Sequence, residues 1–133
     1  MIIRFLTGDH PVHSPQSLTL IKEAIQEKII LQIDSLVIAE CVFVLHKVYS
    51  FTKHDVVDKL LKLLDFSGIH ALDKNIIIEA LHVYNRYNID YVDAYLAAKS
   101  RSKDGTTVIT YNVKDFKKAE AIYTTPDDPL LYQ

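Results

Sequence analysis

Glu40 is the residue whose surroundings most strongly suggest a chemical role. It is the only charged side chain in the apolar run Leu36–Leu45. A carboxylate there should be at least partly desolvated, at a cost on the order of several kcal/mol unless a cation or hydrogen-bond donors compensate it. Either a neighbouring cation or backbone amide satisfies Glu40 within the protein, or the side chain faces a cleft and binds a hard metal ion. Taken alone, Glu40 favours the first interpretation.

Three more oxygen-bearing side chains, Asp93, Asn112 and Asp115, are candidates for the same site. Each has a local structural interpretation: Asp90 and Asp93 suit the start of a helix, Asn112 suits a turn, and Asp115 suits a solvated position or a cap. Taken together with Glu40, however, they come from separate elements. Clustered carboxylates raise one another's pKa unless a cation lies between them. Such a set favours Mg²⁺ or Mn²⁺, whose oxygen ligands and retained waters serve phosphodiester hydrolysis.

The elements that must position these residues alternate along the chain. We expect short strands, and helices that start at capping residues; the strands are 29–33, 69–72, 107–110 and 122–124, and the caps are Ser14, Asp34, Thr52, Asp73 and Asp90. Alternation of this kind predicts an α/β fold with parallel strands and crossover helices. Functional sites of open α/β sheets form outside the carboxyl ends of the strands, which is where the acids are expected to meet.

Composition excludes several other classes of protein. The 133 residues carry a net charge of −2, so any polyanion site must be a local patch. Candidate cations for such a patch, whose alternative is a solvated face, are Lys99, Arg101, Lys103, Lys114, Lys117 and Lys118. The single cysteine, Cys41, fits a cytoplasmic protein with a reduced core thiol. No apolar run reaches the ~18 residues of a membrane span, and three glycines can hardly build a phosphate loop.

Four segments together resemble a PIN domain, and most closely the VapC-type toxins of bacterial toxin–antitoxin pairs. They lie in the expected order over nearly the whole chain: residues 4–9 (RFLTGD), 35–40 (SLVIAE), 89–98 (IDYVDAYLAA) and 110–116 (TYNVKDF). The resemblance implies one domain over residues 1–133 with a three-layer α/β/α fold around a central parallel sheet. It also implies a cytoplasmic, metal-dependent endoribonuclease that uses Mg²⁺ or Mn²⁺, cleaves RNA, binds a cognate antitoxin and forms a homodimer.

The same resemblance assigns roles to the candidate residues. Glu40 corresponds to the second acid of the family and Asp93 to the third, while Asn112 stands at the fourth position with Asp115 as a substitute. Glu40, Asp93 and Asp115 are therefore the expected metal ligands. The chain departs from the pattern at Asn112, which brings no charge, and at Met1, because the family's opening strand and its first aspartate precede this point. Both departures lead us to expect impaired cleavage.

Two alternative functions remain open at this stage. One is a catalytically degenerate PIN-fold module that keeps the antitoxin-binding surface. The other is a receiver-like phosphoacceptor domain, which also gathers acids at strand ends. That domain requires an acidic pair after its first strand and a phosphorylatable aspartate at a central strand end, and this chain has neither. The receiver interpretation therefore ranks last.

Overall fold

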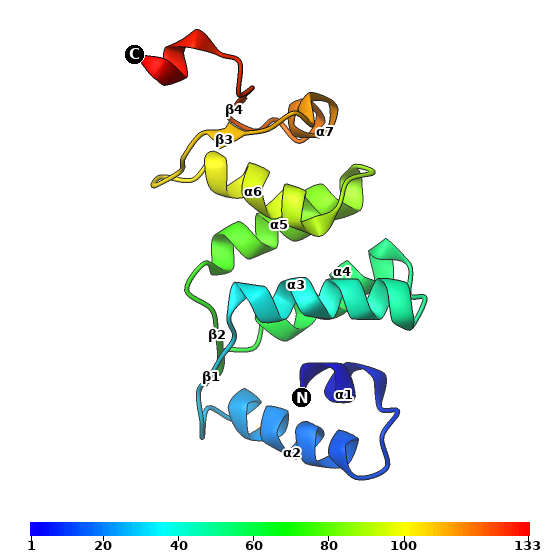
Figure 1. The fold of residues 1–133 in the computed structure, drawn as a ribbon. Coiled ribbons are helices and arrows are strands. Elements are labelled where there is room, and N and C mark those ends of the chain that lie inside the picture. The colour runs from blue at the N-terminus through cyan, green and yellow to red at the C-terminus, as the bar shows by residue number, and fades with distance from the viewer. The chain divides into compact units, whose positions relative to one another are not determined.

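The computed structural model describes residues 1–133, which divide into two compact units, Met1–Lys74 and Asn75–Gln133 (Figure 1). The first unit is mainly helical, with one pair of parallel strands. Its elements are α1 (Ile2–Thr7), α2 (His13–Ile25), β1 (Leu31–Gln32), α3 (Ser35–Phe43), the π-helix η1 (Val44–Val48), α4 (Lys53–Leu64) and β2 (Ile69–His70). Its core consists of side chains such as Ile21, Ile38, Leu45 and Leu60, none of which is exposed.

Local hydrogen bonds start two helices of the first unit where the sequence predicts them. The Asp34 carboxylate accepts a hydrogen bond from the Leu36 amide at 2.8 Å and caps α3. The Thr52 hydroxyl accepts one from the Asp55 amide at 3.1 Å and caps α4. Each bond satisfies an amide that the first turn of a helix leaves without an intrahelical partner.

The prediction that Ser14 caps α2 is wrong. The helix begins at His13, and the Nδ1 atom of His10 accepts hydrogen bonds from the amides of Val12 at 3.2 Å and His13 at 2.9 Å. Ser14 lies inside the first turn, where its hydroxyl accepts a bond from the His10 amide at 3.0 Å. A ring nitrogen four residues upstream therefore takes the capping role that the sequence assigned to a hydroxyl.

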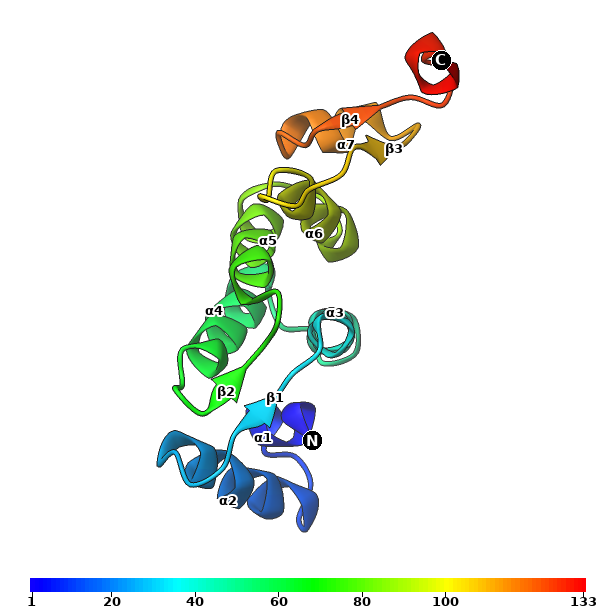
Figure 2. The ribbon, with the colours of Figure 1, turned by 90° about the vertical axis from the view of Figure 1, so that its left-hand side faces the viewer.

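The second unit is smaller and begins with two consecutive helices. It contains α5 (Lys74–Arg86), α6 (Tyr91–Ser100), β3 (Val108–Ile109), α7 (Val113–Lys118), β4 (Tyr123–Thr124) and the 3-10 helix η2 (Pro129–Tyr132). Figure 2 shows α7 beside the β3–β4 pair, with which it packs through β4. Apart from Tyr91, the buried residues of α6 are small: Ala94, Ala97, Ala98 and Ser100.

The four predicted strands exist but are shorter than expected and form two separate pairs. β1 is parallel to β2, with Leu31 opposite Ile69, and β3 is parallel to β4, with Val108 opposite Tyr123. Each is a two-stranded sheet, so β3 takes β4 as its hydrogen-bonded neighbour instead of joining β1 and β2. An α/β fold with parallel pairing is confirmed, while the three-layer arrangement and the single domain stay predictions.

Gly68 lies so close to α2 that a Cβ atom there would be 2.0 Å from the carbonyl oxygen of Ala24, so only glycine fits where β2 begins. Cys41 is buried on α3, and burial together with the nearby charge of Glu40 raises the pKa of its thiol to about 11. Membrane spans are not found, because each helix is too short or too polar to cross a bilayer.

Candidate functional site

Asp93 lies in the first turn of α6, where its side chain is half-buried. Asp90 occupies the N-cap position with an extended backbone (φ −71°, ψ 152°), but its side chain forms no capping hydrogen bond. The predicted N-cap position of Asp90 is therefore confirmed, although its side chain does not supply the capping bond. Its carboxylate instead adds negative charge near Asp93 and helps to raise the pKa of Asp93.

Asn112 and Asp115 are placed by the loop that links β3 to α7. The Asn112 amide donates a hydrogen bond to the Thr110 hydroxyl at 2.9 Å, which fixes the turn after the strand. Asn112 is then the N-cap of α7, and its Oδ1 atom accepts a bond from the Asp115 amide at 3.4 Å. The turn role predicted for Asn112 is confirmed. Thr110 positions the site but was not singled out, although a threonine two residues before an asparagine is a readable turn signal.

The Asn112 side-chain amide joins the two carboxylates of this unit. Its Nδ2 atom donates to Asp115 Oδ2 at 2.9 Å and, over a longer distance of 3.5 Å, to Asp93 Oδ2. Asp93 and Asp115 come from different helices and meet only through this group. The structure thus brings together three of the four predicted site residues in the second unit, and we call this set the Asp93 cluster: Asp93, Asn112 and Asp115.

The electrostatics of the Asp93 cluster disfavour its negative charge. The pKa of Asp93 is raised above its usual value, mainly by burial and then by repulsion from Asp90 and Asp115. The hydrogen bond from Asn112 opposes this shift but does not cancel it. A cation beside Asp93 would therefore stabilise the ionised form of its carboxylate.

Glu40 belongs to the first unit and lies on α3 with its side chain exposed. The expectation that its apolar surroundings desolvate it is therefore wrong. Although Ile38, Cys41 and Val42 face the core, Leu36 is 78% exposed and Phe43 is 62% exposed, so the apolar run has an outer face that includes Glu40. Its approach to Asp93 across a shared metal ion stays a prediction.

The donor chemistry of the Asp93 cluster suits a hard divalent cation. Mg²⁺ is usually bound through one or two carboxylates and keeps several waters. Asp93 and Asp115 offer two carboxylates, while the Asn112 side chain directs its NH₂ group towards them and its Oδ1 atom towards the Asp115 backbone amide. No group of three or more His, Cys, Asp or Glu side chains in this structure is placed to hold a metal ion.

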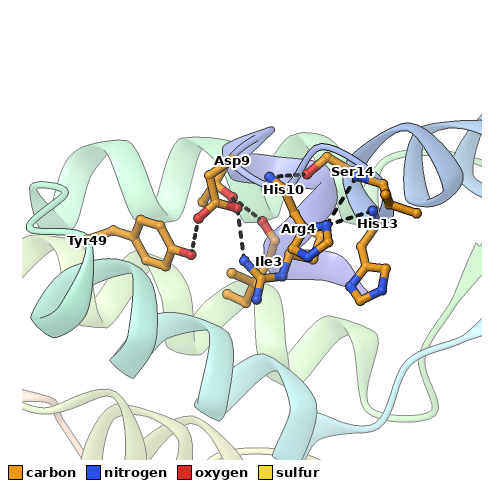
Figure 3. Close-up of polar contacts among 9 residues, drawn as sticks. Ile3, Arg4, Asp9, His10, His13, Ser14 and Tyr49 are labelled. Atoms are coloured by element: carbon orange, nitrogen blue, oxygen red, sulfur yellow. Dashed lines mark hydrogen bonds and ion pairs between the residues drawn. The ribbon is translucent and has the colours of Figure 1, made fainter.

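A second polar network, in the first unit, was not predicted from the sequence (Figure 3). Asp9 accepts hydrogen bonds from the Tyr49 hydroxyl at 2.5 Å and the Thr7 hydroxyl at 2.7 Å, and pairs with Arg4 at 3.2 Å. These donors lower the pKa of Asp9 to about 2. The nearby His10 and His13 rings are stacked, with centroids 3.9 Å apart. We call the Asp9 group, with Arg4, Thr7 and Tyr49, the Asp9 network.

Comparison with known proteins gives one match. Neither the curated proteins nor the solved structures include a match to this sequence. The sequence profile of the PIN domain, however, matches residues 2–122, which include both the Asp9 network and the Asp93 cluster. This match extends over most of the chain, and the chain therefore belongs to the PIN domain family.

Proposed function

We propose that this protein is a metal-dependent endoribonuclease of the VapC toxin type. PIN domains are typically metal-dependent nucleases, which gives the reaction class. The observation that carries the proposal is the Asp93 cluster, in which two carboxylates from α6 and α7 meet and the pKa of Asp93 is raised. Groups with such perturbed pKa values concentrate at functional sites.

Asp93, Asp115 and Glu40 are the residues that would hold Mg²⁺ or Mn²⁺. The bound ion would neutralise charge on the scissile phosphodiester and lower the pKa of a water nucleophile. The protein's own contribution is positional. Asn112 holds the Asp115 carboxylate at 2.9 Å through its amide, and it fixes the first turn of α7 through its Oδ1 atom.

RNA, a cognate antitoxin and a second copy of the chain are the proposed partners, in the cytoplasm. Support for RNA comes from α7, which begins at the Asp93 cluster and carries Lys114, Lys117 and Lys118 along its short length. Cations close to a phosphodiester site attract the nucleic-acid backbone and release its counterions. The antitoxin and the homodimer follow from the VapC type proposed above.

A catalytically degenerate binding module is the second candidate function. It is favoured by the Asn112 amide, which donates to both carboxylates of the cluster. An NH₂ group in this position already offsets part of the repulsion that a cation would remove. In this alternative the fold and the partner surface are kept, and RNA is not cleaved.

An RNA cleavage assay on the full chain separates the two. With Mg²⁺ or Mn²⁺ present we expect cleavage that EDTA stops and that Asp93→Asn reduces by at least about 100-fold, since losing a charged ligand removes several kcal/mol of transition-state stabilisation. Asp104→Asn is the matched control, because Asp104 is exposed in a turn of the same unit. Robust cleavage that survives both EDTA and Asp93→Asn contradicts the nuclease proposal, and no cleavage under any condition supports the binding module.

A further inference from the structure

The second unit contains a polar pocket that has no part in the Asp93 cluster. Its volume is about 560 Å³, and it is an open pocket lined by the exposed side of α5, the end of α6 and the end of α7. The lining residues that carry polar groups are Glu79, His82, Asn85, Arg86, Tyr87, Arg101 and Glu120. We call it the α5 pocket.

Arg101 forms one wall of the α5 pocket, and its guanidinium is already hydrogen-bonded and ion-paired within the protein. Its guanidinium donates to the carbonyl oxygen of Ala119 and pairs with the carboxylate of Glu79. The side chain is only 24% exposed and ties together α5, α6 and the end of α7. Because Glu79 compensates its charge, Arg101 gives the wall rigidity and adds little net positive charge.

The other charged groups of the pocket are not engaged. Arg86 is exposed in the last turn of α5 and forms no hydrogen bond or ion pair in the structure. Glu120 is also exposed and without a partner, and its backbone has a positive φ of 56° directly after α7. The pocket therefore presents one free cation and one free carboxylate. A simple anion would gain from Arg86 but be repelled by Glu120.

Aromatic and amide groups lie in the same pocket as these two charges. The half-buried Tyr87 and the exposed His82 line the pocket with aromatic rings, and Asn85 adds an amide. Proteins recognise unpaired RNA bases by stacking them on aromatic rings and by hydrogen bonding to their edges. Arginine is a common partner of phosphate oxygens.

From these groups we infer that the α5 pocket binds one nucleotide of single-stranded RNA. Arg86 contacts the phosphate, Tyr87 and His82 stack on the base, and Glu120 accepts a hydrogen bond from an exocyclic amino group of the base. This inference rests on the proposed function and names a part of the substrate away from the scissile bond. It also implies base preference: cytosine presents an N4 amino donor to a carboxylate, whereas uracil presents a carbonyl oxygen there.

The position of the pocket relative to the Asp93 cluster fits a single strand that reaches both. Asp93 lies in the first turn of α6 and Arg101 is the residue that ends it. The separation of eight positions from Asp93 to Arg101 corresponds to about 12 Å along the helix axis at 1.5 Å per residue. A chain bound at the cluster would therefore enter the α5 pocket after a short run of nucleotides.

Binding of labelled oligonucleotides tests this inference on the full chain. Fluorescence anisotropy is measured with short cytidine-only and uridine-only RNA strands, in EDTA so that the strands stay intact. We expect the cytidine strand to bind at least about fivefold more tightly, because a specific base contact gives discrimination of this order or more. Arg86→Ala should weaken both strands by about tenfold, and Glu120→Gln should remove the preference for cytidine. Lys22→Ala is the matched control, since Lys22 is an exposed lysine on α2 of the other unit.

Arg86 and Glu120 are both exposed, so these variants should fold, and circular dichroism checks that they do. Equal affinity of the wild type for the two strands, or Arg86→Ala binding like Lys22→Ala, overturns the inference. Equal loss of heparin and RNA binding in Arg86→Ala, with no base preference, would reveal a simple anion site and also overturns it. The cleavage assay separates this from the proposed function. If cleavage depends on Asp93 but the pocket variants bind RNA like the wild type, the nuclease proposal stands and the inference about the α5 pocket is wrong. If the pocket variants behave as expected but RNA is not cleaved, the inference stands and the nuclease proposal is wrong.

Discussion

Asp9 and Asp93 are two aspartates of one chain whose surroundings shift their pKa values in opposite directions. Asp9 accepts bonds from a tyrosine and a threonine hydroxyl and pairs with an arginine, so its pKa falls to about 2. Asp93 is half-buried near Asp90 and Asp115 and receives one long bond from an amide, so its pKa rises. The first carboxylate is satisfied by the fold. The second is left in need of positive charge, which is the state expected of a ligand or catalytic group.

The largest expected difference between the two residues is in cleavage. Asp93→Asn should reduce metal-dependent RNA cleavage by at least about 100-fold, whereas Asp9→Asn should change the rate of the folded protein by less than about threefold. The reason is that the Asp9 charge is already balanced within its network. Rates are measured at 25 °C on protein shown to be folded by circular dichroism. An equal loss of cleavage in both variants would contradict the statement that Asp93 takes part in cleavage and Asp9 does not.

Asn112→Asp should add negative charge to the Asp93 cluster and so increase its difference from the Asp9 network. A third carboxylate strengthens repulsion in the empty site and raises affinity for a hard cation, and we expect Mg²⁺ to bind about tenfold more tightly. Isothermal titration calorimetry measures the affinity. Asn75→Asp, which adds the same charge at an exposed position on α5, is the control. Unchanged affinity in Asn112→Asp would mean that Asp93 and Asp115 do not hold the ion.

The charges of Asp9 and Asp93 should change the free energy of unfolding in opposite directions. The pKa of Asp9 is about 2 in the folded protein against 3.8 ordinarily, so its contribution to stability is complete above 3.8 and is lost as pH falls towards 2. Asp93 has a raised pKa, so its contribution becomes unfavourable as pH rises above 3.8. Without divalent ions, Asp9→Asn should therefore destabilise the protein at pH 7. Asp93→Asn should stabilise it slightly, because burial and the charges of Asp90 and Asp115 disfavour the ionised carboxylate that the variant removes. Urea unfolding between pH 2 and 7 tests both, and a shift of the same sign in the two variants would contradict this account.

The smallest expected effect concerns His10, which lies next to the Asp9 network. Its Nδ1 atom accepts two backbone amides and so must be unprotonated, and its pKa is lowered by burial and by His13 and Arg4, against the opposing charge of Asp9. The unfolded chain takes up the proton first, so stability should be complete above about 6.5 and decline below it.

The protection factors of the Val12 and His13 amides, which compare the exchange measured by NMR with the intrinsic exchange at the same pH, should fall as pH falls from 7 to 5. His10→Asn keeps a capping oxygen and should remove this dependence, while His13→Asn should keep it. Protection factors at these amides that are independent of pH in the wild type would show that the His10 ring does not cap α2.

The parts of the molecule that were predictable from sequence are those set by neighbouring residues. The caps at Asp34 and Thr52 are bonds over two and three residues, and the turn at Asn112 is equally local. The meeting of Asn112 with Asp93, nineteen residues away, followed from the rule that sites form at strand ends.

Other contacts had no local signal. Tyr49 reaches Asp9 over forty residues, and nothing near either residue indicates the other. The expectation that Glu40 is at least partly desolvated was wrong because a helix within an apolar run still has a solvent-facing side. Here that side carries Leu36 and Phe43 as well as Glu40. The predicted strands were longer than the observed ones, because the hydrogen-bonded part of a strand ends where its partner strand ends. The position of that end depends on residues elsewhere in the chain.

The buried thiol of Cys41 makes this chain convenient for site-specific labelling. With a pKa of about 11 and little exposure, it is almost wholly protonated at neutral pH and should react slowly with maleimides or methanethiosulfonates. A cysteine introduced at an exposed position would then be the only reactive one, without any need to mutate the native residue. Pairs such as Leu36→Cys with Tyr111→Cys, whose side chains are 78% and 82% exposed, would carry spin labels on the two units. Pulsed electron paramagnetic resonance could follow the distance between them as Mg²⁺ or RNA is added.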